Sequence, residues 1–338
     1  MNHVLIIAEA GVNHNGSIEL AKELIDIAAE AKVDFVKFQT WITEDIIAKG
    51  APKAEYQVKN DGDDSQYEMA KRLELSWNDF KELKQYCDQK GVNFLSTAEE
   101  FKSLDFLVDD LKIPLIKIGS GELNNTLFLR EVGAKRLPVI LSTGMATMEE
   151  VEIAYKTLKE AGAKEITVLH CTTNYPTAYE EVNLKAMLTI KDKLKVPVGY
   201  SDHTLGIEVP VAAVSLGAVV IEKHYTIDKN LPGPDHKASL DPIELKNMVT
   251  QIRNIEMAIS GDGRKEPTES EIRIRPNIRK GLYLARDVIA GEVLTKYHFN
   301  FKRPVKDIPV DEADFVLGKK VLRDLPKDHA LEKKDLDV

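Results

Sequence analysis

The chain has 338 residues, more than one average domain, and its 43% hydrophobic and 30% charged content excludes a disordered or fibrous protein. Because 55 Asp and Glu outnumber 46 Lys and Arg, the net charge of −9 argues against a nucleic-acid partner or an anionic membrane surface. Two cysteines cannot form a disulfide framework, and the apolar stretch 4–8 is too short for a membrane span or a signal peptide, so we predict a cytoplasmic protein.

Up to about residue 260, short apolar runs alternate with longer amphipathic segments, which is the pattern of repeated strand–helix units around a parallel sheet. Eight such runs lie at residues 4–9, 34–39, 92–97, 114–120, 138–144, 165–171, 196–203 and 218–225. Eight parallel strands within roughly 250 residues fit a closed (β/α)₈ barrel better than a doubly wound sheet. We therefore predict an α/β fold in which residues 1–260 form a TIM-barrel catalytic domain.

Three segments depart from this repeat. The polar stretch 44–72 follows the second run and is longer than an ordinary strand–helix loop, so we expect a lid or functional loop on the active face. Residues 261–276 are charged and contain Gly and Pro, which is typical of a linker. Residues 277–338 carry short apolar patches broken by turn signals, which predict a compact, β-rich second domain.

Catalytic groups in such barrels project from the carboxyl ends of the strands, and these ends are polar in this sequence. Lys37 and Lys117 can supply the positive charge that a phosphate needs. The hydroxyls of Ser120, Ser142 and Ser201 and the backbone amides of the GSGE and STG turns add hydrogen-bond donors. A single strand-end Lys is more often solvated or ion-paired, but two at one barrel mouth favour an anion site.

The other polar candidates are two histidines and three acids. His203 and His224 end neighbouring runs, where two imidazoles can share one divalent ion. A lone strand-end His is more often a hydrogen-bonded core residue, so the pattern alone leaves both interpretations open. Glu9 and Glu122 are candidates for positioning water or moving protons, with a structural hydrogen-bond acceptor as the alternative. Asp235, after the eighth run, can bind the hydroxyls of a sugar.

Nine motifs follow one another along the chain, each at a predicted strand end or in the loop after it. They are IIAEAGVNHNG, VKFQT, FLST, IKIGSGE, LSTGM, LHCTTNYP, GYSDHT, EKHYT and PGPDHKAS. Together they resemble the motifs of the bacterial sialic acid synthase family, which includes N-acetylneuraminate and legionaminate synthases. The C-terminal segment, with ARDVIAGEVL and FKRP, resembles the SAF (antifreeze-like) domain that follows the barrel in this family.

The resemblance implies a domain-swapped homodimer in which the SAF domain caps the partner's active site. It also implies an enzyme that condenses phosphoenolpyruvate with an N-acylated amino sugar, either N-acetylmannosamine or a 2,4-diacetamido-trideoxyhexose, and releases phosphate. A divalent metal, Mn²⁺ or Mg²⁺, would be held by His203 and His224. Phosphoenolpyruvate would be held by Lys37, Thr97, Lys117, Ser120, Ser142 and Ser201. The acceptor sugar would contact Gln39, Tyr175, Asp235 and Arg303 of the partner subunit.

Two positions depart from the family pattern. Thr173 stands where some members have an Asn that binds phosphoenolpyruvate, and Arg303 is followed by PVKDIP rather than a Gly-rich continuation. Two other functions compete with the synthase. A Schiff-base aldolase on the same barrel would use Lys117 as its nucleophile without a metal. A non-catalytic carbohydrate-binding or coat-assembly protein could keep the fold, although the intact set of strand-end residues argues against it.

Overall fold

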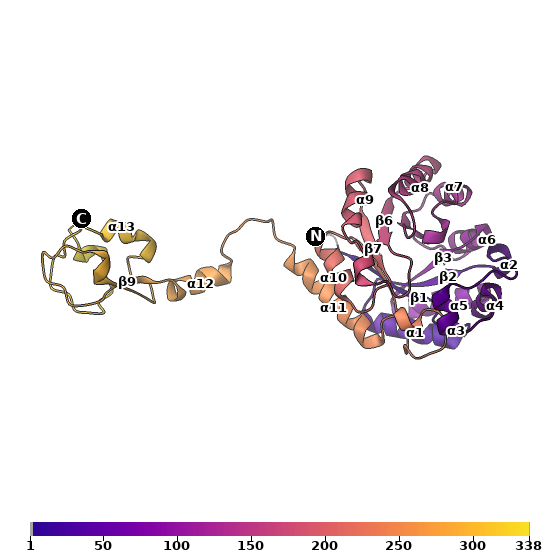
Figure 1. The fold of residues 1–338 in the computed structure, drawn as a ribbon, viewed down its shortest axis with the longest axis horizontal. Helices are drawn as coiled ribbons and strands as arrows, with labels where there is room; N and C mark the ends of the chain where they lie inside the picture. The colour runs from indigo at the N-terminus through magenta and orange to yellow at the C-terminus, as the bar shows by residue number, and fades with distance from the viewer. Residues whose placement is uncertain (1–2, 338) are drawn as a thin grey trace. The chain divides into compact units, whose positions relative to one another are not determined.

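The computed structural model describes residues 3–337, and the chain divides after Ser260 into two compact units (Figure 1). The first unit is a closed barrel of eight parallel strands in which each strand pairs with the next and the last pairs with the first. The strands are β1 (Leu5–Gly11), β2 (Phe35–Thr40), β3 (Asn93–Ala98), β4 (Ile116–Ile118), β5 (Val139–Ser142), β6 (Ile166–Cys171), β7 (Val198–Asp202) and β8 (Val220–His224). All eight predicted runs form these strands, and the predicted (β/α)₈ barrel is confirmed.

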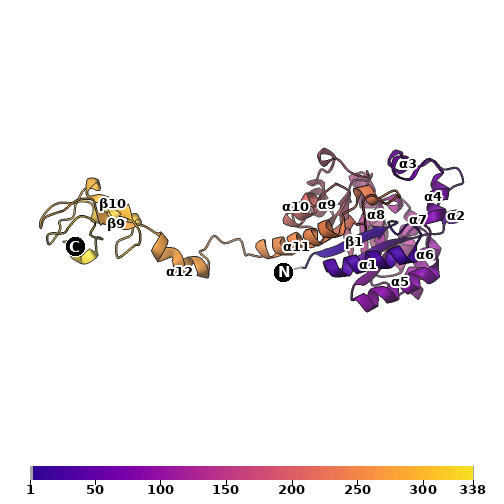
Figure 2. The same cartoon turned by 90° about the horizontal axis from the view of Figure 1, so that it is seen from below.

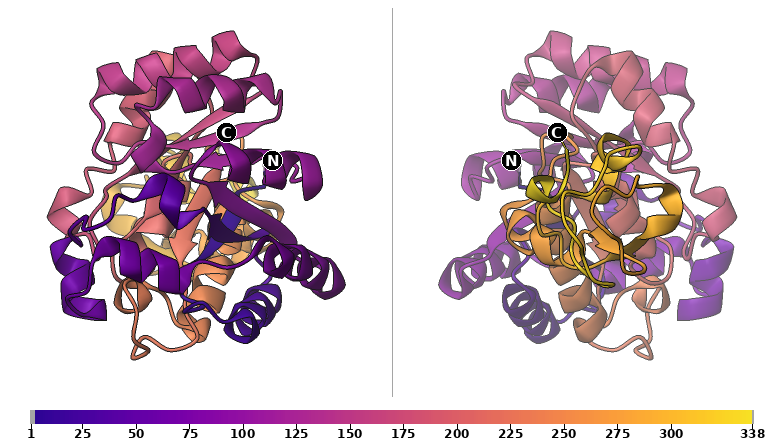
Figure 3. Two further views of the ribbon diagram at one scale, coloured as in Figure 1. Left: turned by 90° about the vertical axis from the view of Figure 1, so that its right-hand side faces the viewer. Right: turned by 90° about the vertical axis from the view of Figure 1, so that its left-hand side faces the viewer.

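Amphipathic helices surround the strands (Figure 3). In α1 (Ile18–Ala31) the buried residues recur every three or four positions, and Ser17 caps the helix by accepting a hydrogen bond from the Leu20 amide. Capping boxes of Ser or Thr with an acid three residues later begin α5 (Trp77–Lys90) and α8 (Met148–Ala161) in the same way. The remaining outer helices are α6 (Phe101–Asp105), α7 (Thr126–Ala134), α9 (Ala186–Leu194), α10 (Glu208–Ser215) and α11 (Pro242–Ala258).

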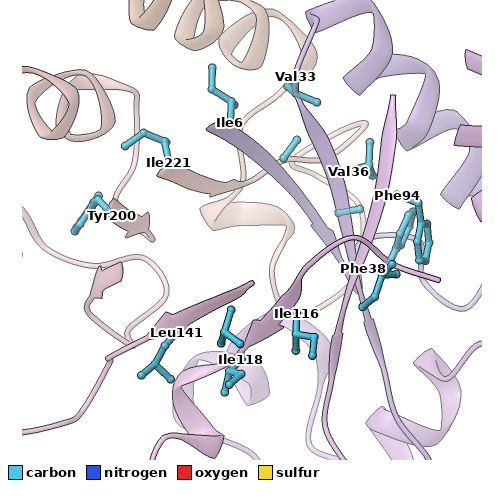
Figure 4. Close-up of a cluster of buried hydrophobic side chains, with 14 of the residues drawn as sticks. Ile6, Val33, Val36, Phe38, Phe94, Ile116, Ile118, Leu141, Tyr200 and Ile221 are labelled. Atoms are coloured by element: carbon cyan, nitrogen blue, oxygen red, sulfur yellow. The ribbon is translucent and has the colours of Figure 1, made fainter. Parts of the chain in front are cut away.

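The two-residue period of the strands separates the apolar core from the polar mouth of the barrel. Outward-facing residues such as Ile6, Val36 and Phe38 pack beneath the helices (Figure 4). A layer of inward-facing apolar residues fills the barrel interior, namely Ile7, Phe35, Leu95, Ile140, Leu169 and Val220. Two positions further along the same strands stand Glu9, Lys37, Thr97, Ser142, Cys171 and Glu222. The strand alternation therefore places a polar layer directly on an apolar floor.

The stretch 44–72 folds into three short helices instead of an open loop (Figure 2). Trp41, Met69 and Leu73 pack with Val12 and anchor this segment to the barrel. The Lys53 side chain is buried and pairs with Asp61 at 2.9 Å and with Asp64, and Arg72 pairs with the same two acids at 2.6 and 2.8 Å. The helices are α2 (Thr43–Ile46), α3 (Glu55–Asp61) and α4 (Gln66–Leu73).

The predicted linker 261–276 is helical from Glu269 onward and lies within the second unit, which begins at Gly261. Thr268 and Glu271 form a capping box that starts α12 (Glu269–Ile278), so only the residues before it are irregular. The rest of the unit has its own apolar core and a small antiparallel sheet. Its elements are β9 (Gly281–Leu284), β10 (Phe299–Lys302) and α13 (Ala313–Val316). Within residues 3–337, no helix is both long enough and apolar enough to span a membrane.

Candidate active site

A cavity of about 180 Å³ opens at the carboxyl ends of the strands, and we call it the mouth cavity. Every residue singled out from the sequence lines it except Glu122, Asp235 and Arg303. Its lining comprises Glu9, Lys37, Gln39, Thr97, Glu99, Lys117, Gly119, Ser120, Gly121, Ser142, Cys171, Thr173, Tyr175, Ser201, His203, Glu222 and His224. A larger cavity of about 570 Å³ between α8 and α9 contains neither strand-end lysine, so the chemistry concentrates in the mouth cavity.

The strand register brings the charged residues of the mouth cavity side by side. Glu9 pairs in register with Lys37 on one neighbouring strand and with His224 on the other. Thr97 pairs with Lys117 in the same way. Glu9 and His224, which lie 215 positions apart in the chain, thus become neighbours, because a closed barrel joins its first strand to its last.

Lys37 and Lys117 share one carboxylate. Lys37 Nζ lies 2.6 Å from Glu9 Oε2 and 3.7 Å from Glu222 Oε2, and it donates to Thr97 Oγ1 at 2.8 Å. Lys117 Nζ lies 3.3 Å from Glu222 Oε1 and donates to Ser142 Oγ at 2.7 Å. Burial disfavours the charged form of Lys37, but the negative charges of Glu222 and Glu9 outweigh burial, so the pKa of Lys37 is raised. For Lys117, burial and the positive charge of Lys37 prevail, so its pKa is lowered.

Glu9 lies between the lysine pair and the histidine pair. Its burial raises the pKa to about 7, against the lowering effect of Lys37 and with a further increase from the charge of Glu222. Gln39 Nε2 donates to Glu9 Oε1 at 3.1 Å. Gly11 has φ +52, and a Cβ there would lie 3.2 Å from the His224 ring and 3.3 Å from Glu9 Oε1. A glycine therefore allows the carboxyl and the imidazole to approach each other.

The serines predicted to bind phosphate hold the turns and the charged groups in place. Ser120 Oγ accepts a hydrogen bond from the Gly144 amide at 2.9 Å, and Ser201 Oγ donates to Glu222 Oε1 at 3.0 Å. A Cβ on Gly144 would lie only 1.9 Å from Thr173 Oγ1 and 2.8 Å from Ser120 Oγ. The GSGE and STG turns and Thr173 therefore pack together so closely that a side chain at position 144 would displace Thr173 or Ser120.

His203 and His224 lie together at the edge of the mouth cavity, with ring centroids 5.5 Å apart, and Tyr175 packs against both rings. In its neutral form, His203 donates from Nδ1–H to the Thr172 carbonyl at 2.7 Å and keeps a lone pair on Nε2. Burial lowers the pKa of this ring, but Cys171 and the Thr172 carbonyl outweigh burial and raise the pKa. His224 Nδ1 is buried without a hydrogen-bond partner among the described residues, and burial, followed by the charges of His203 and Lys37, holds its pKa well below the usual value. Two such imidazoles are suited to one divalent ion.

The described residues contain no group of three or more His, Cys, Asp and Glu side chains arranged to hold a metal. The available protein ligands are thus the two histidines. Asp235 Oδ2 lies 4.0 Å from His224 Nδ1. A metal held by only two protein groups would keep open coordination positions for water or substrate. The donor set therefore fits a catalytic ion better than a structural one.

A second cavity of about 260 Å³, which we call the side cavity, adjoins the mouth cavity beneath the segment 41–73. Three of the four residues predicted to contact the acceptor line it, namely Gln39, Tyr175 and Asp235, whereas Arg303 does not. Burial raises the pKa of Asp235 to about 6, against the lowering effect of His203. The ring of Tyr56 from α3 stacks on Tyr175 with the centroids 5.1 Å apart, so the helical segment contributes directly to this cavity.

Two residues singled out from the sequence lie elsewhere, and one important residue was missed. Glu122 lines a third cavity, and its carboxylate accepts a hydrogen bond from Asn125 Nδ2 at 2.7 Å. Arg303 directly follows β10 in the second unit and is exposed. Glu99 lines all three cavities but was not recognised, because it lies one residue beyond β3, outside the strand periodicity. The sequence carries no distinguishing signal for it, since the Glu-Glu pair in TAEEF recurs at 149–150 and 180–181.

Comparison with known proteins matches each unit of the chain to a family. Residues 24–265 match the NeuB family, and residues 279–337 match the SAF domain. The chain belongs to the NeuB family. The predictions of a synthase of the sialic acid type and of a barrel followed by a SAF domain are thereby confirmed.

Two relatives of this NeuB-family chain and one solved structure illustrate the similarity. The N,N'-diacetyllegionaminic acid synthase of Legionella pneumophila is 46% identical over 325 residues, which cover 95% of this chain and 91% of the relative. The protein of the same name from Campylobacter jejuni is 46% identical over 334 residues, 98% of this chain and 99% of the relative. The structure of N-acetylneuraminic acid synthetase from Leptospira borgpetersenii, in complex with citrate, has a TM-score of 0.71 and 36% identity, covering 80% of this chain and 90% of that one.

Proposed function

We propose that this chain condenses phosphoenolpyruvate with a 2,4-diacetamido-trideoxyhexose to give a sialic-acid-type nonulosonate and inorganic phosphate. The observation that carries the proposal is the mouth cavity, where the Lys37 and Lys117 pair lies beside the His203 and His224 pair and opens into a side cavity of sugar size. The choice of a diacetamido sugar over N-acetylmannosamine is supported by the names of the two relatives at 46% identity.

The lysine pair suits the anionic substrate. Phosphoenolpyruvate carries a carboxylate and a phosphate, and two buried ammonium groups stabilise such charge without reorganisation. Lys37 and Lys117 are already held by Glu222, Thr97 and Ser142, so their positions are set before the substrate arrives. Ser120 and the amides of its turn would add neutral donors.

His203 and His224 would hold a divalent ion, Mn²⁺ or Mg²⁺, which supplies Lewis acidity to the aldehyde oxygen of the open-chain acceptor. Carbon 3 of phosphoenolpyruvate forms the new bond to the aldehyde carbon, water adds to carbon 2, and the C–O bond to phosphate breaks. With a pKa of about 7, the Glu9 carboxyl can both accept and return a proton near neutral pH. Its position between Lys37 and His224 suits it to orient the water that adds to carbon 2.

The test is phosphate release from phosphoenolpyruvate with a panel of N-acylated amino sugars, with and without added Mn²⁺ or Mg²⁺. Wild-type protein should release phosphate only when an acceptor is present, and His203→Ala or His224→Ala should abolish the release. A matched control is His170→Gln, since His170 also lies on a strand end but bonds to the Val182 carbonyl outside the mouth cavity. Full activity of either alanine variant would contradict the metal assignment.

The Schiff-base aldolase is less consistent with the contacts of Lys117. Burial and the charge of Lys37 lower the pKa of Lys117, but its Nζ contacts three acceptors, Ser142 Oγ, the Ile118 carbonyl and Glu222, which suit a protonated ammonium. Borohydride added with a ketoacid should therefore leave Lys117 unmodified. A covalent adduct on this lysine, detected by mass spectrometry, would instead favour the aldolase.

We also propose a cytoplasmic homodimer in which Arg303 of the partner subunit contacts the acceptor. The SAF match over residues 279–337 and the exposure of Arg303 support this arrangement. Mixing Arg303→Ala protein with His203→Ala protein should partly restore activity after subunit exchange, because a mixed dimer has one mouth with both defects and one with neither. If mass spectrometry verifies the exchange and activity stays absent, the domain-swapped arrangement is wrong.

A further inference from the structure

Glu99 occupies the junction of the cavities at the barrel mouth. Its backbone N–H donates to the Thr40 carbonyl at 3.2 Å, which fixes its Cα beside the end of β2. Its side chain lines the mouth cavity, the side cavity and a third cavity of about 470 Å³. Glu99 Oε1 would lie 3.8 Å from a Cβ built on Gly119, so the carboxylate stands over the start of the GSGE turn.

The Glu99 carboxylate has no protein partner. Within residues 3–337 its oxygens receive no hydrogen bond, and no Lys, Arg or His nitrogen lies within the 4.0 Å that defines an ion pair. The other acids of the region are engaged. Glu9 pairs with Lys37, Glu222 pairs with both lysines, and Glu122 accepts from Asn125. Glu99 is only half-buried, so water can solvate its carboxylate in the free protein, and a ligand that displaces this water must supply donors of its own.

The position of Glu99 indicates which substrate supplies those donors. A carboxylate repels the phosphate and carboxylate of phosphoenolpyruvate, so it gains nothing from that ligand in its ionised form. Four residues line both the mouth cavity and the side cavity, namely Gln39, Glu99, Tyr175 and His224. A sugar that extends from the histidine pair into the side cavity therefore passes Glu99.

The lining of the side cavity describes the acceptor further. Among the described residues that line it, none is Lys or Arg, and its two acids are Glu99 and Asp235. Its wall includes the apolar side chains Trp41, Ile46, Ile47, Met69 and Leu73. Such a cavity is poorly suited to a phosphate group and well suited to methyl groups alongside hydroxyl or amide donors.

We propose that Glu99 is a specificity-determining residue, whose carboxylate accepts hydrogen bonds from hydroxyl or acylamino N–H groups of an unphosphorylated acceptor sugar and disfavours a phosphorylated one. This role rests on the proposed synthase function. Burial and the charge of Glu122 raise the pKa of the Glu99 carboxyl to about 7, against the lowering effect of Lys37 and Lys117. Donors from the sugar would reverse this effect by stabilising the ionised form.

The test is Glu99→Gln, which keeps the shape of the side chain and removes its charge. The Michaelis constant for the acceptor should rise about tenfold, the factor expected when a hydrogen bond to a charged group is lost, while calorimetric binding of phosphoenolpyruvate is unchanged. N-acetylmannosamine 6-phosphate should inhibit the variant more strongly than the wild type, because the neutral glutamine no longer repels its phosphate. The matched control is Glu100→Gln, whose carboxylate accepts from the Ser103 amide at 2.8 Å and lies outside the mouth and side cavities.

An unchanged acceptor constant in an active, folded Glu99→Gln protein would overturn the role of Glu99 and leave the synthase function standing. An equal loss of phosphoenolpyruvate binding would overturn it too, since the residue would then support the phosphate site. Should the variant fail to fold, Glu99→Asp keeps the charge but withdraws the carboxylate by one methylene, and the same rise in the acceptor constant is expected. If the wild type releases no phosphate with any sugar, the proposed function fails first and this role fails with it.

Discussion

The unpartnered carboxyl of Glu99 predicts that Glu99→Gln stabilises the ligand-free protein at high pH but not at low pH. Burial of Glu99 and the nearby charge of Glu122 raise its pKa from 4.5 to about 7, against the opposing charges of Lys37 and Lys117 and together with Glu9. Below about pH 4.5 the carboxyl is protonated in both the folded and the unfolded chain, so it does not lower the free energy of unfolding. Above pH 7 it is ionised in both, and the folded state carries the full penalty.

The size of the effect follows from the shift. A pKa difference of this size corresponds to at most about 3 kcal/mol, and partial solvation through the cavity reduces the expected value to between about 1 and 3 kcal/mol. Glutamine resembles the protonated acid and avoids this cost. The free energy of unfolding of Glu99→Gln should therefore exceed that of the wild type by this amount at pH 8, while the difference at pH 4.5 should be small.

The assay is urea unfolding of the ligand-free wild type and variant at several pH values, followed by circular dichroism. The difference between the two proteins should grow mainly between pH 4.5 and 7, the window set by the unfolded and folded pKa values of Glu99. A difference that is the same at pH 4.5 and pH 8 would refute the reasoning. Glu99 would then have a normal pKa and a partner for its charge in solution.

Three further predictions concern the mouth and side cavities. Lys117→Met should lower kcat/KM for phosphoenolpyruvate about 10- to 150-fold, because a charge-assisted contact is lost, and an unchanged value would assign the lysine to a structural ion pair. Gly144→Ala should impair phosphoenolpyruvate binding, since its Cβ would lie 1.9 Å from Thr173 Oγ1, and adding Thr173→Ala should partly restore the affinity measured by calorimetry. Tyr56→Ala should raise the Michaelis constant for the acceptor severalfold, because the stack on Tyr175 is lost. Tyr56→Phe keeps the stack and should leave this constant unchanged, and equal effects of both variants would argue against the stack.

Much of the barrel and of its polar layer could be predicted from local pattern. Side chains alternate between the two faces of a strand, so the apolar Phe35 and the polar Lys37, two positions further along, point to the same face. This relation does not depend on the rest of the chain. The same rule located Thr97 and Ser142. The sequence thus determined the eight strands, the polar strand ends and, through nine ordered motifs, the family.

Tertiary structure alone decided which of these residues meet and how their charges are compensated. Closure of the barrel puts Glu9 beside His224, and Glu222 between two lysines, which no local pattern encodes. Glu99 lies on a loop, where no periodicity fixes the direction of a side chain, and only its neighbours show that its carboxylate lacks a partner. Strand periodicity is a property of the local backbone, whereas burial, pKa and cavity lining depend on contacts between distant segments, and these exist only after the barrel has closed.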